Sequence, residues 1–355
     1  MTWQIHPISC YPEYHQAWDT LLAKHHPIPF LESIFLQPLI EEFGSGNEML
    51  AIETDGNTLR AATIVVRGRF GFWQTFQPSQ LPLGPWIAVP GSDLVGLTQS
   101  LIKALPGIAL GVGITQIDPL LTTRPPDTPG ISTLDYIDTA WVEIEGDYDT
   151  YWNARGKNLR TNIRKQRTKL ETDGVTATLE CIDQPEHVAA AMVDYGNLEI
   201  AGWKAEGGTA IHPDNAQGRF YRKMLESFCA QGRGRIYRYR FDNKPVAMDL
   251  CIEAGDRIVI LKTAYDETYK TLSPSSLMRY EQFKQFFEAG KLRRIEFYGK
   301  VMEWHSRWTN NARNIFHLTR YRWPVLQTMH SKLRSWRADR STPAEPTTKA
   351  GKQPY

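Results

Sequence analysis

The chain has 355 residues, of which 41% are hydrophobic and 23% charged, a composition that is ordinary for a globular protein and excludes wholesale disorder. This length exceeds the size at which one hydrophobic core stops growing, so we expect two domains. The formal net charge of +2 argues against general nucleic-acid binding, because dedicated binders carry a strong basic excess, and we expect no DNA partner.

Cysteine spacing and hydropathy indicate the compartment. Cys10, Cys181, Cys229 and Cys251 are scattered without paired metal-ligand spacing, which suits a reducing cytosol and predicts no metal site. No apolar run approaches the roughly 18 residues needed to span a bilayer, and the N-terminus has neither a basic leader nor a continuous apolar core. We therefore predict a cytoplasmic protein without a membrane span.

The first 140 residues alternate helical and strand-like patterns. Helical apolar spacing and turn residues predict, in chain order, helices over Tyr14–Lys24 and Leu31–Phe43, strands over Met49–Glu53, Leu59–Arg67 and Phe70–Phe76, a helix over Gly96–Ala104 and a strand over Ile108–Ile117. The order of helices and strands matches one mixed sheet covered by helices.

One long basic helix is predicted over Asp149–Asp173, closed by Gly174. An apolar stripe recurs at helical spacing along it: Trp152, Leu159, Ile163 and Leu170. Cations cover much of the remaining surface: Lys157, Arg160, Arg164, Lys165, Arg167 and Lys169. These cations fit either an anion site or a solvated face without a ligand.

The later half repeats the earlier order. We predict helices over Pro185–Leu198 and Arg219–Gln231, a strand meander, a helix over Ser275–Ala289, and strands over Arg294–Phe297 and Ile315–Tyr321. The meander begins at Ile236, and in its strand 246–252 Asp249 stands between Ala247 and Cys251, whose small side chains leave room for a ligand. Asp249 also fits a half-exposed strand position without a chemical role.

Several phrases occur in an order and spacing that resembles the GNAT-superfamily acyltransferases of the CelD (cellulose biosynthesis) type, relatives of the Fem-type peptidyltransferases. They are Arg219-Phe220-Tyr221-Arg222, Pro245-Val246-Ala247, Leu261–Glu267, Leu272-Ser273-Pro274 and Glu296-Phe297-Tyr298-Gly299. The resemblance covers roughly residues 140 to 325. It implies an α/β fold of tandem GNAT-like domains, each a mixed, mostly antiparallel sheet flanked by helices.

The predicted domains are an N-terminal GNAT-like domain over residues 1–140 and a C-terminal acyltransferase domain over 141–330. A polar tail over 331–355 is expected to be disordered.

The resemblance also implies acyl-CoA as co-substrate. Ser273, Ser275 and Ser276 stand at a helix start, whose free N–H groups suit an anion, and in GNAT proteins that corner holds the coenzyme A pyrophosphate. Arg160 and Arg164 match a basic feature of the family and are assigned to the same cofactor.

Catalytic and acceptor-binding residues complete the predicted site. Asp249, Glu296 and His305 are the candidate bases and Tyr265 the candidate acid, because an amine must lose a proton while a thiolate gains one. The glycine-rich segment 200–211 predicts a loop over a cleft, with Trp203 and Lys204 binding the acceptor. Lys262 and Arg307 are assigned to the substrate as well. Each of these residues also fits a purely structural role.

The predicted function is an N-acyltransferase that moves an acyl group from acyl-CoA to a small amine: an amino sugar, an amino acid or an envelope-precursor metabolite. Two alternatives remain open at this point. One is a Fem-type ligase that uses aminoacyl-tRNA, which the basic helix favours. The other is a non-catalytic binding protein in polysaccharide or lipid assembly. The oligomeric state is not predicted.

Overall fold

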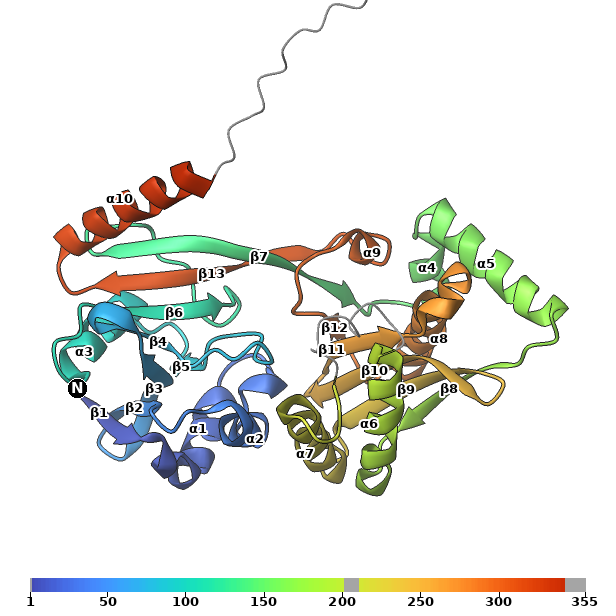
Figure 1. The fold of residues 1–355 in the computed structure, drawn as a ribbon, viewed down its shortest axis with the longest axis horizontal. Coiled ribbons are helices and arrows are strands. Elements are labelled where there is room, and N and C mark those ends of the chain that lie inside the picture. The colour runs from blue at the N-terminus through green and yellow to red at the C-terminus, as the bar shows by residue number, and fades with distance from the viewer. Residues whose placement is uncertain (1, 201–210, 342–355) are drawn as a thin grey trace, which may run out of the picture.

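The computed structural model describes residues 2–200 and 211–341. It shows two lobes side by side, joined along one border by two long strands (Figure 1). The strands form one 13-stranded mixed sheet in the order β1-β2-β3-β4-β6-β13-β7-β12-β11-β10-β9-β8, with β5 paired to β3. Helices pack on both lobes, so the predicted fold class, mixed α/β and mostly antiparallel, is confirmed.

The first lobe contains five successive strands of this sheet. Strands β1 to β4 pair antiparallel, and after helix α3 strand β6 returns parallel to β4. The bounds are β1 Trp3–Pro7, α1 His15–Leu22, α2 Ser33–Phe43, β2 Met49–Asp55, β3 Thr58–Arg67, β4 Phe72–Thr75, β5 Trp86–Ala88, α3 Leu94–Ala104 and β6 Gly111–Ile117, with 3-10 turns η1 Ile8–Tyr14, η2 Pro29–Leu31 and η3 Arg69–Gly71.

The second lobe repeats this topology. Strands β8 to β11 pair antiparallel, and after helix α8 strand β12 returns parallel to β11. The bounds are β8 Ala177–Ile182, α6 Pro185–Ile200, α7 Ala216–Ala230, β9 Gly234–Phe241, β10 Lys244–Ala254, β11 Arg257–Tyr265, η5 Glu267–Leu272, α8 Pro274–Ala289 and β12 Arg294–Glu296. Apart from the extra strand β5 of the first lobe, the two lobes therefore have the same order of strands and helices and the same pairing.

Two long strands, β7 and β13, join the lobes. Strand β7, Ile131–Glu143, pairs with β13 along most of its length and with β12 at its end. Strand β13, Ala312–Tyr321, comes from the end of the chain yet pairs with β6 of the first lobe. Each lobe therefore contains a strand segment from the other half of the sequence, and the division at residue 140 stays a prediction.

Several predicted elements need correction. The long helix over 149–173 is two helices, α4 Tyr148–Asn153 and α5 Lys157–Thr172, because Gly156 has extended ψ and starts the second helix. Strands β1, β5, β7 and β8 were not predicted. Helix α10, Pro324–Ser341, extends into the segment expected to be disordered; residues 342–355 lie outside the described residues. The short helix α9 spans Glu303–Ser306.

A shared core joins the lobes. Phe35 of α2 packs edge-on against Phe220 of α7, with ring centroids 5.2 Å apart, and Phe30 packs against Tyr298 at 4.6 Å. All four side chains belong to one cluster of buried hydrophobic residues. Because apolar burial is the main favourable term in folding, this continuous core holds the two lobes together.

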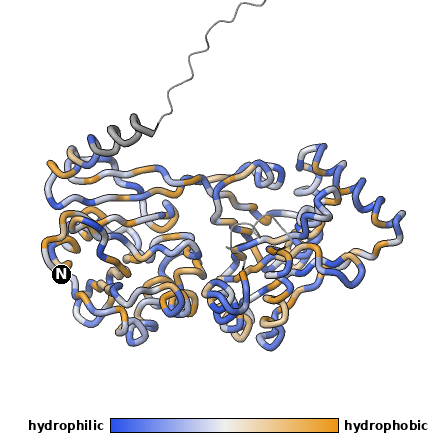
Figure 2. The backbone as a smooth tube through the Cα atoms, viewed as in Figure 1, coloured by the Kyte–Doolittle hydropathy of each residue, from blue (hydrophilic) through white to orange (hydrophobic). Residues whose placement is uncertain are grey.

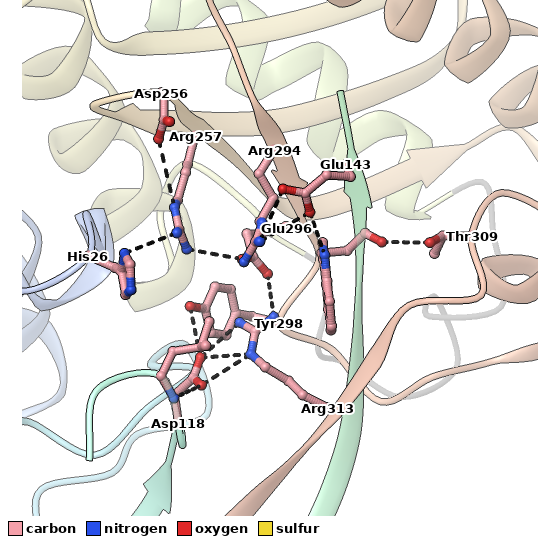
Figure 3. A network of polar contacts seen from close by, with 12 residues as sticks. His26, Asp118, Glu143, Asp256, Arg257, Arg294, Glu296, Tyr298, Thr309 and Arg313 are labelled. Carbon is pink, nitrogen blue, oxygen red and sulfur yellow. Dashed lines mark hydrogen bonds and ion pairs between the residues drawn. The ribbon is translucent and has the colours of Figure 1, made fainter. Parts of the chain in front are cut away.

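A buried ionic network fixes the same junction (Figure 3). Arg313 of β13 donates to Asp118 at 2.8 Å and to Glu296 of β12 at 2.9 Å. Tyr298 also donates to Asp118, at 3.1 Å, and Arg257 of β11 lies 3.5 Å from Glu296. The side chains of Arg313, Asp118 and Glu296 are 8%, 0% and 1% exposed, so each charge depends on its partners rather than on water.

Replacing Arg313 by Met should destabilise the protein by about 3–5 kcal/mol, because it leaves two buried carboxylates without their shared cation. The measurement is the free energy of unfolding in urea. The matched control is Arg124→Met, which removes an exposed pair with Asp135 and should cost less than about 1 kcal/mol. Equal effects of the two substitutions would contradict the role given to the network.

Candidate functional site

The central feature of the second lobe is a pair of parallel strands that separate. Strands β11 and β12 pair only from Arg257 to Val259 and from Arg294 to Glu296. Strand β11 then continues to Tyr265, while the chain after Glu296 turns away into a loop and α9. A cavity of about 490 Å³ opens where the strands part, lined by β11, the start of α8 and residues 297–308.

Helix α8 begins at this cavity. As predicted, Pro274 lies in the first turn of this helix, at its first position. Proline is tolerated there because the N–H that it lacks would have no partner within the helix. Ser273 has left-handed backbone angles (φ 48°) and makes no side-chain cap; its hydroxyl instead accepts a hydrogen bond from Gln166 of α5 at 3.3 Å. Ser273, Ser275 and Ser276 all line the cavity, so the first turn of the helix faces it.

The cavity carries positive charge. Four cationic side chains line it: Lys262, Lys270, Arg279 and Arg307. Among the described residues that line it, none is Asp or Glu. Together with the positive end of the α8 dipole, these cations favour an anionic ligand.

A hydrogen-bonded chain leads from the cavity to Asp249. Thr263, which lines the cavity, donates to the Asp249 carboxylate at 2.5 Å and accepts from Arg279 at 3.1 Å. Asp249 and Thr263 are directly opposite in the β10–β11 ladder. The Asp249 side chain is fully buried beneath α8 and does not line the cavity, so the open space predicted beside it is filled by Arg279.

The environment of Asp249 raises its pKa above the ordinary value. Burial raises the pKa of this carboxyl, and Arg279, Thr263 and Gln282 partly oppose that effect. One carboxylate oxygen has no hydrogen-bond partner in the described structure. The buried Asp249 side chain contacts both Thr263 and Arg279 and so positions them.

His305 lines the cavity as a neutral imidazole. Burial is the main reason that its pKa falls to about 4, and the nearby Arg279 lowers it further. The Met302 backbone N–H donates to its Nδ1 at 2.9 Å, so in the neutral ring the hydrogen is on Nε2. This arrangement makes His305 a hydrogen-bond donor rather than the base proposed from the sequence.

The structure brings together only part of the predicted site. Tyr265, Lys262, His305, Arg307 and the serines at the start of α8 surround one cavity. Glu296 lies in the buried ionic network instead.

The remaining predicted residues do not line the cavity. Arg160 donates to the Arg155 carbonyl, and Arg164 is exposed on α5. Trp203 and Lys204 lie outside the described residues.

Residues 157–306 match the family described as acetyltransferase (GNAT) domain. This stretch, which is less than half of the chain, is similar to GNAT acetyltransferase domains. It contains helix α5 and all of the second lobe's sheet up to β12, so every residue that lines the cavity, apart from Arg307 and Trp308 at its edge, lies within the matched region. No curated protein matches the chain.

Solved structures share the fold at low sequence identity. The C-terminal domain of a putative lysylphosphatidylglycerol synthetase from Agrobacterium fabrum matches with a TM-score of 0.56 and 14% identity, covering 91% of this chain and 96% of that one. FemX matches with a TM-score of 0.56 and 10% identity, covering 89% of this chain and 98% of that one. A conserved protein of unknown function from Bacteroides thetaiotaomicron matches with a TM-score of 0.55 and 9% identity, covering 86% of this chain and 97% of that one. These similarities extend the shared fold over both lobes.

Three polar residues that line the cavity, Thr263, Lys270 and Arg279, were not predicted from the sequence. Arg279 falls among Leu277, Met278 and Phe283 on the buried side of α8, and a cation on an apolar stripe is a readable signal. Thr263 carries no such signal, because its importance comes from the β-sheet register that places it opposite Asp249. No group of three or more His, Cys, Asp or Glu side chains in residues 2–200 and 211–341 could hold a metal.

His305→Gln should flatten the acid dependence of stability. The unfolded imidazole binds a proton near its usual pKa of 6.5, whereas the folded one does so only near 4. In this interval the unfolded chain binds more protons, so the wild type loses stability as the pH falls. Between neutral pH and about pH 4.5, the variant should lose about 2 kcal/mol less of its free energy of unfolding.

The measurement is urea unfolding at several pH values. His187→Gln, at an exposed site on α6, is the matched control and should keep the wild-type dependence. A His305→Gln protein with the wild-type slope would show that the imidazole is not held neutral.

Proposed function

We propose that the protein is an N-acyltransferase that takes an acyl group from acyl-CoA and transfers it to an amine. The observation that carries this proposal is the separation of β11 and β12 over a cationic cavity at the start of α8. A diphosphate needs N–H donors and positive charge at one end of its site, and the thioester needs hydrogen-bond donors at the other. The cavity offers both within one GNAT domain.

The donor can be oriented from the charges that line the cavity. Ser275 and Ser276 in the first turn of α8, with Lys270 beside them, suit the pyrophosphate. The thioester then lies along β11, beyond Val259, where that strand has no β12 partner in the described structure. Backbone N–H groups on that edge and the Nε2–H of His305 are suited to polarise the carbonyl oxygen.

The reaction is aminolysis of a thioester. The amine nitrogen attacks the carbonyl carbon, a C–N bond forms and the C–S bond breaks. Tyr265, which lines the cavity and is 37% exposed, gives its hydroxyl proton to the leaving sulfur and then accepts the proton that the nitrogen loses. Asp249 acts as a positioning residue, through Thr263 and Arg279.

The acceptor is proposed only as a class. A small primary amine on an amino sugar, an amino acid or an envelope precursor agrees with the CelD-type resemblance. Within residues 2–200 and 211–341 no helix is long and apolar enough to cross a membrane.

A second candidate is transfer of an aminoacyl group from tRNA, as in Fem-type ligases. Helix α5 favours it, because its exposed surface is strongly basic and Figure 2 shows hydrophilic residues along most of its length. Arg164, Lys165 and Lys169 on this helix are exposed and suit a phosphate backbone. The cavity at α8 suits either donor, so binding measurements with coenzyme A and with aminoacyl-tRNA must distinguish them.

Coenzyme A should stabilise the protein against heat. At about a hundred times its dissociation constant, a ligand adds about 2.7 kcal/mol, a rise of a few degrees in the melting temperature. Ser275→Glu should remove most of this shift, because it places a carboxylate where the pyrophosphate is expected. Acetyl-CoA and a long-chain acyl-CoA tested in parallel report the preferred acyl length.

The matched control is Ser92→Glu, just before helix α3 at the corresponding corner of the first lobe, which should leave the shift intact. Failure of all three CoA ligands to raise the melting temperature would reject acyl-CoA as donor. Stabilisation by aminoacyl-tRNA that Arg164→Glu abolishes would then support the second candidate.

A further inference from the structure

The first lobe ends in an exposed apolar surface that the proposed reaction does not use. Three chain segments, 66–72, 103–110 and 320–332, meet there at the end of the sheet. The Leu110 N–H donates to Gly71 at 2.8 Å, and the Arg322 N–H donates to Leu110 at 2.9 Å. Rings of Phe72 and His330 lie 6.0 Å apart. The corner between β13 and α10 lies far from α8 along the long axis of the molecule (Figure 1).

Five bulky side chains, which we call the apolar tip, are exposed on these segments. Their exposed fractions are 87% for Phe70, 69% for Ile108, 48% for Trp323, 62% for Val325 and 57% for Met329. Singly exposed apolar residues are normal, but a group on adjoining segments marks a binding surface.

Phe70 is held outward in an unusual conformation. Its backbone is left-handed (φ 54°, ψ 34°), a region that bulky residues rarely adopt. The adjoining Gly71 is also left-handed, and an added Cβ there would meet the Ile108 carbonyl oxygen at 3.0 Å. The turn therefore packs closely on the Ile108 loop while the Phe70 ring points to solvent, so packing does not account for an aromatic residue here.

Helix α10 contributes a stripe to the same surface. Its inner side is tied to the sheet, because Gln327 accepts from the Gly130 N–H at 2.7 Å and Tyr321 pairs with His330 at 2.6 Å. Val325, Met329 and Lys332 follow at steps of four and three residues, which places them on one exposed side. The helix is thus fixed with apolar side chains outward.

Cations accompany the apolar tip. The three segments contain six basic residues and no acidic residue: Arg67, Arg69, Lys103, Arg320, Arg322 and Lys332. Exposed aromatic and aliphatic side chains among cations are the pattern of surfaces that enter the interface of an anionic bilayer.

We propose that the apolar tip binds the surface of a membrane rich in anionic lipid, placing the chain there peripherally. A second copy of the chain fits this surface poorly, because a two-fold interface would set each group of cations against its equivalent. The proposal is independent of the donor used at the cavity.

The test is co-sedimentation of the full chain with vesicles of phosphatidylcholine alone and of phosphatidylcholine with phosphatidylglycerol. We expect binding to the anionic vesicles only, weakened about tenfold or more in Phe70→Asn/Ile108→Asn, since both apolar insertion points are lost. Asn tolerates left-handed angles, so the turn is kept. Arg69→Glu should weaken binding about fivefold or more and make it less sensitive to salt.

Matched controls are Val193→Asn, at an exposed apolar site on α6 (46% exposed), and Lys24→Glu, at an exposed cation after α1; both should bind as the wild type does. Unchanged thermal melting of the variants shows that they fold. Equal binding to neutral vesicles, or equal loss in the controls, overturns the proposal. Two further results would also overturn it: a concentration-dependent dimer, or binding to a single-stranded oligonucleotide. Either counts if the Phe70→Asn/Ile108→Asn change abolishes it while vesicle binding persists.

Discussion

The short parallel pairing of β11 and β12 is the constraint on which the candidate site depends. Pairing stops at Val259 and Glu296, and the cavity opens immediately beyond. Glu296 is also the residue that Arg313 holds at 2.9 Å within the buried ionic network. The last paired residue of β12 is therefore fixed by charges from both lobes. Glu296, proposed as a catalytic base from its position in the sequence, is instead buried among arginines at the point where the strands part.

The repeated topology makes the difference between the lobes informative. In the first lobe, the strand corresponding to β11 is interrupted, because β4 and β5 pair with successive parts of β3 and residues 76–85 lie between them. Asp93 caps the start of helix α3: its carboxylate accepts from the Val95 N–H, and the residue lines a cavity of about 340 Å³. A carboxylate already occupies the position that a phosphate would need. The corresponding corner at α8 has serines and cations, so one lobe suits an anionic donor and the other does not.

The sequence predicted those helices and strands that are marked by periodicity or by turn residues within the same short segment. The meander after Ile236, the start of α8 at Pro274 and the end of α2 before Gly44 all follow from periodicity and turn residues. Strand β7 was missed because its residues 133–138 alternate weakly, and its partner β13 is far away in the sequence. The same cause hid Asp118, whose partner Arg313 is brought near only by the crossed strands. For the site, the sequence indicated Tyr265, His305 and the α8 serines. It could not indicate that Arg279 fills the space beside Asp249, because that depends on how α8 packs on the sheet.

The most direct measurement is a crystal structure of the chain with coenzyme A. We predict that the pyrophosphate lies at the N–H groups of Ser275 and Ser276, the pantetheine arm between β11 and residues 297–308, and the sulfur near His305 and Tyr265. Coenzyme A bound instead on α5, or at the start of α3 beside Asp93, would contradict the central claim that the parted strands of the second lobe form the donor site.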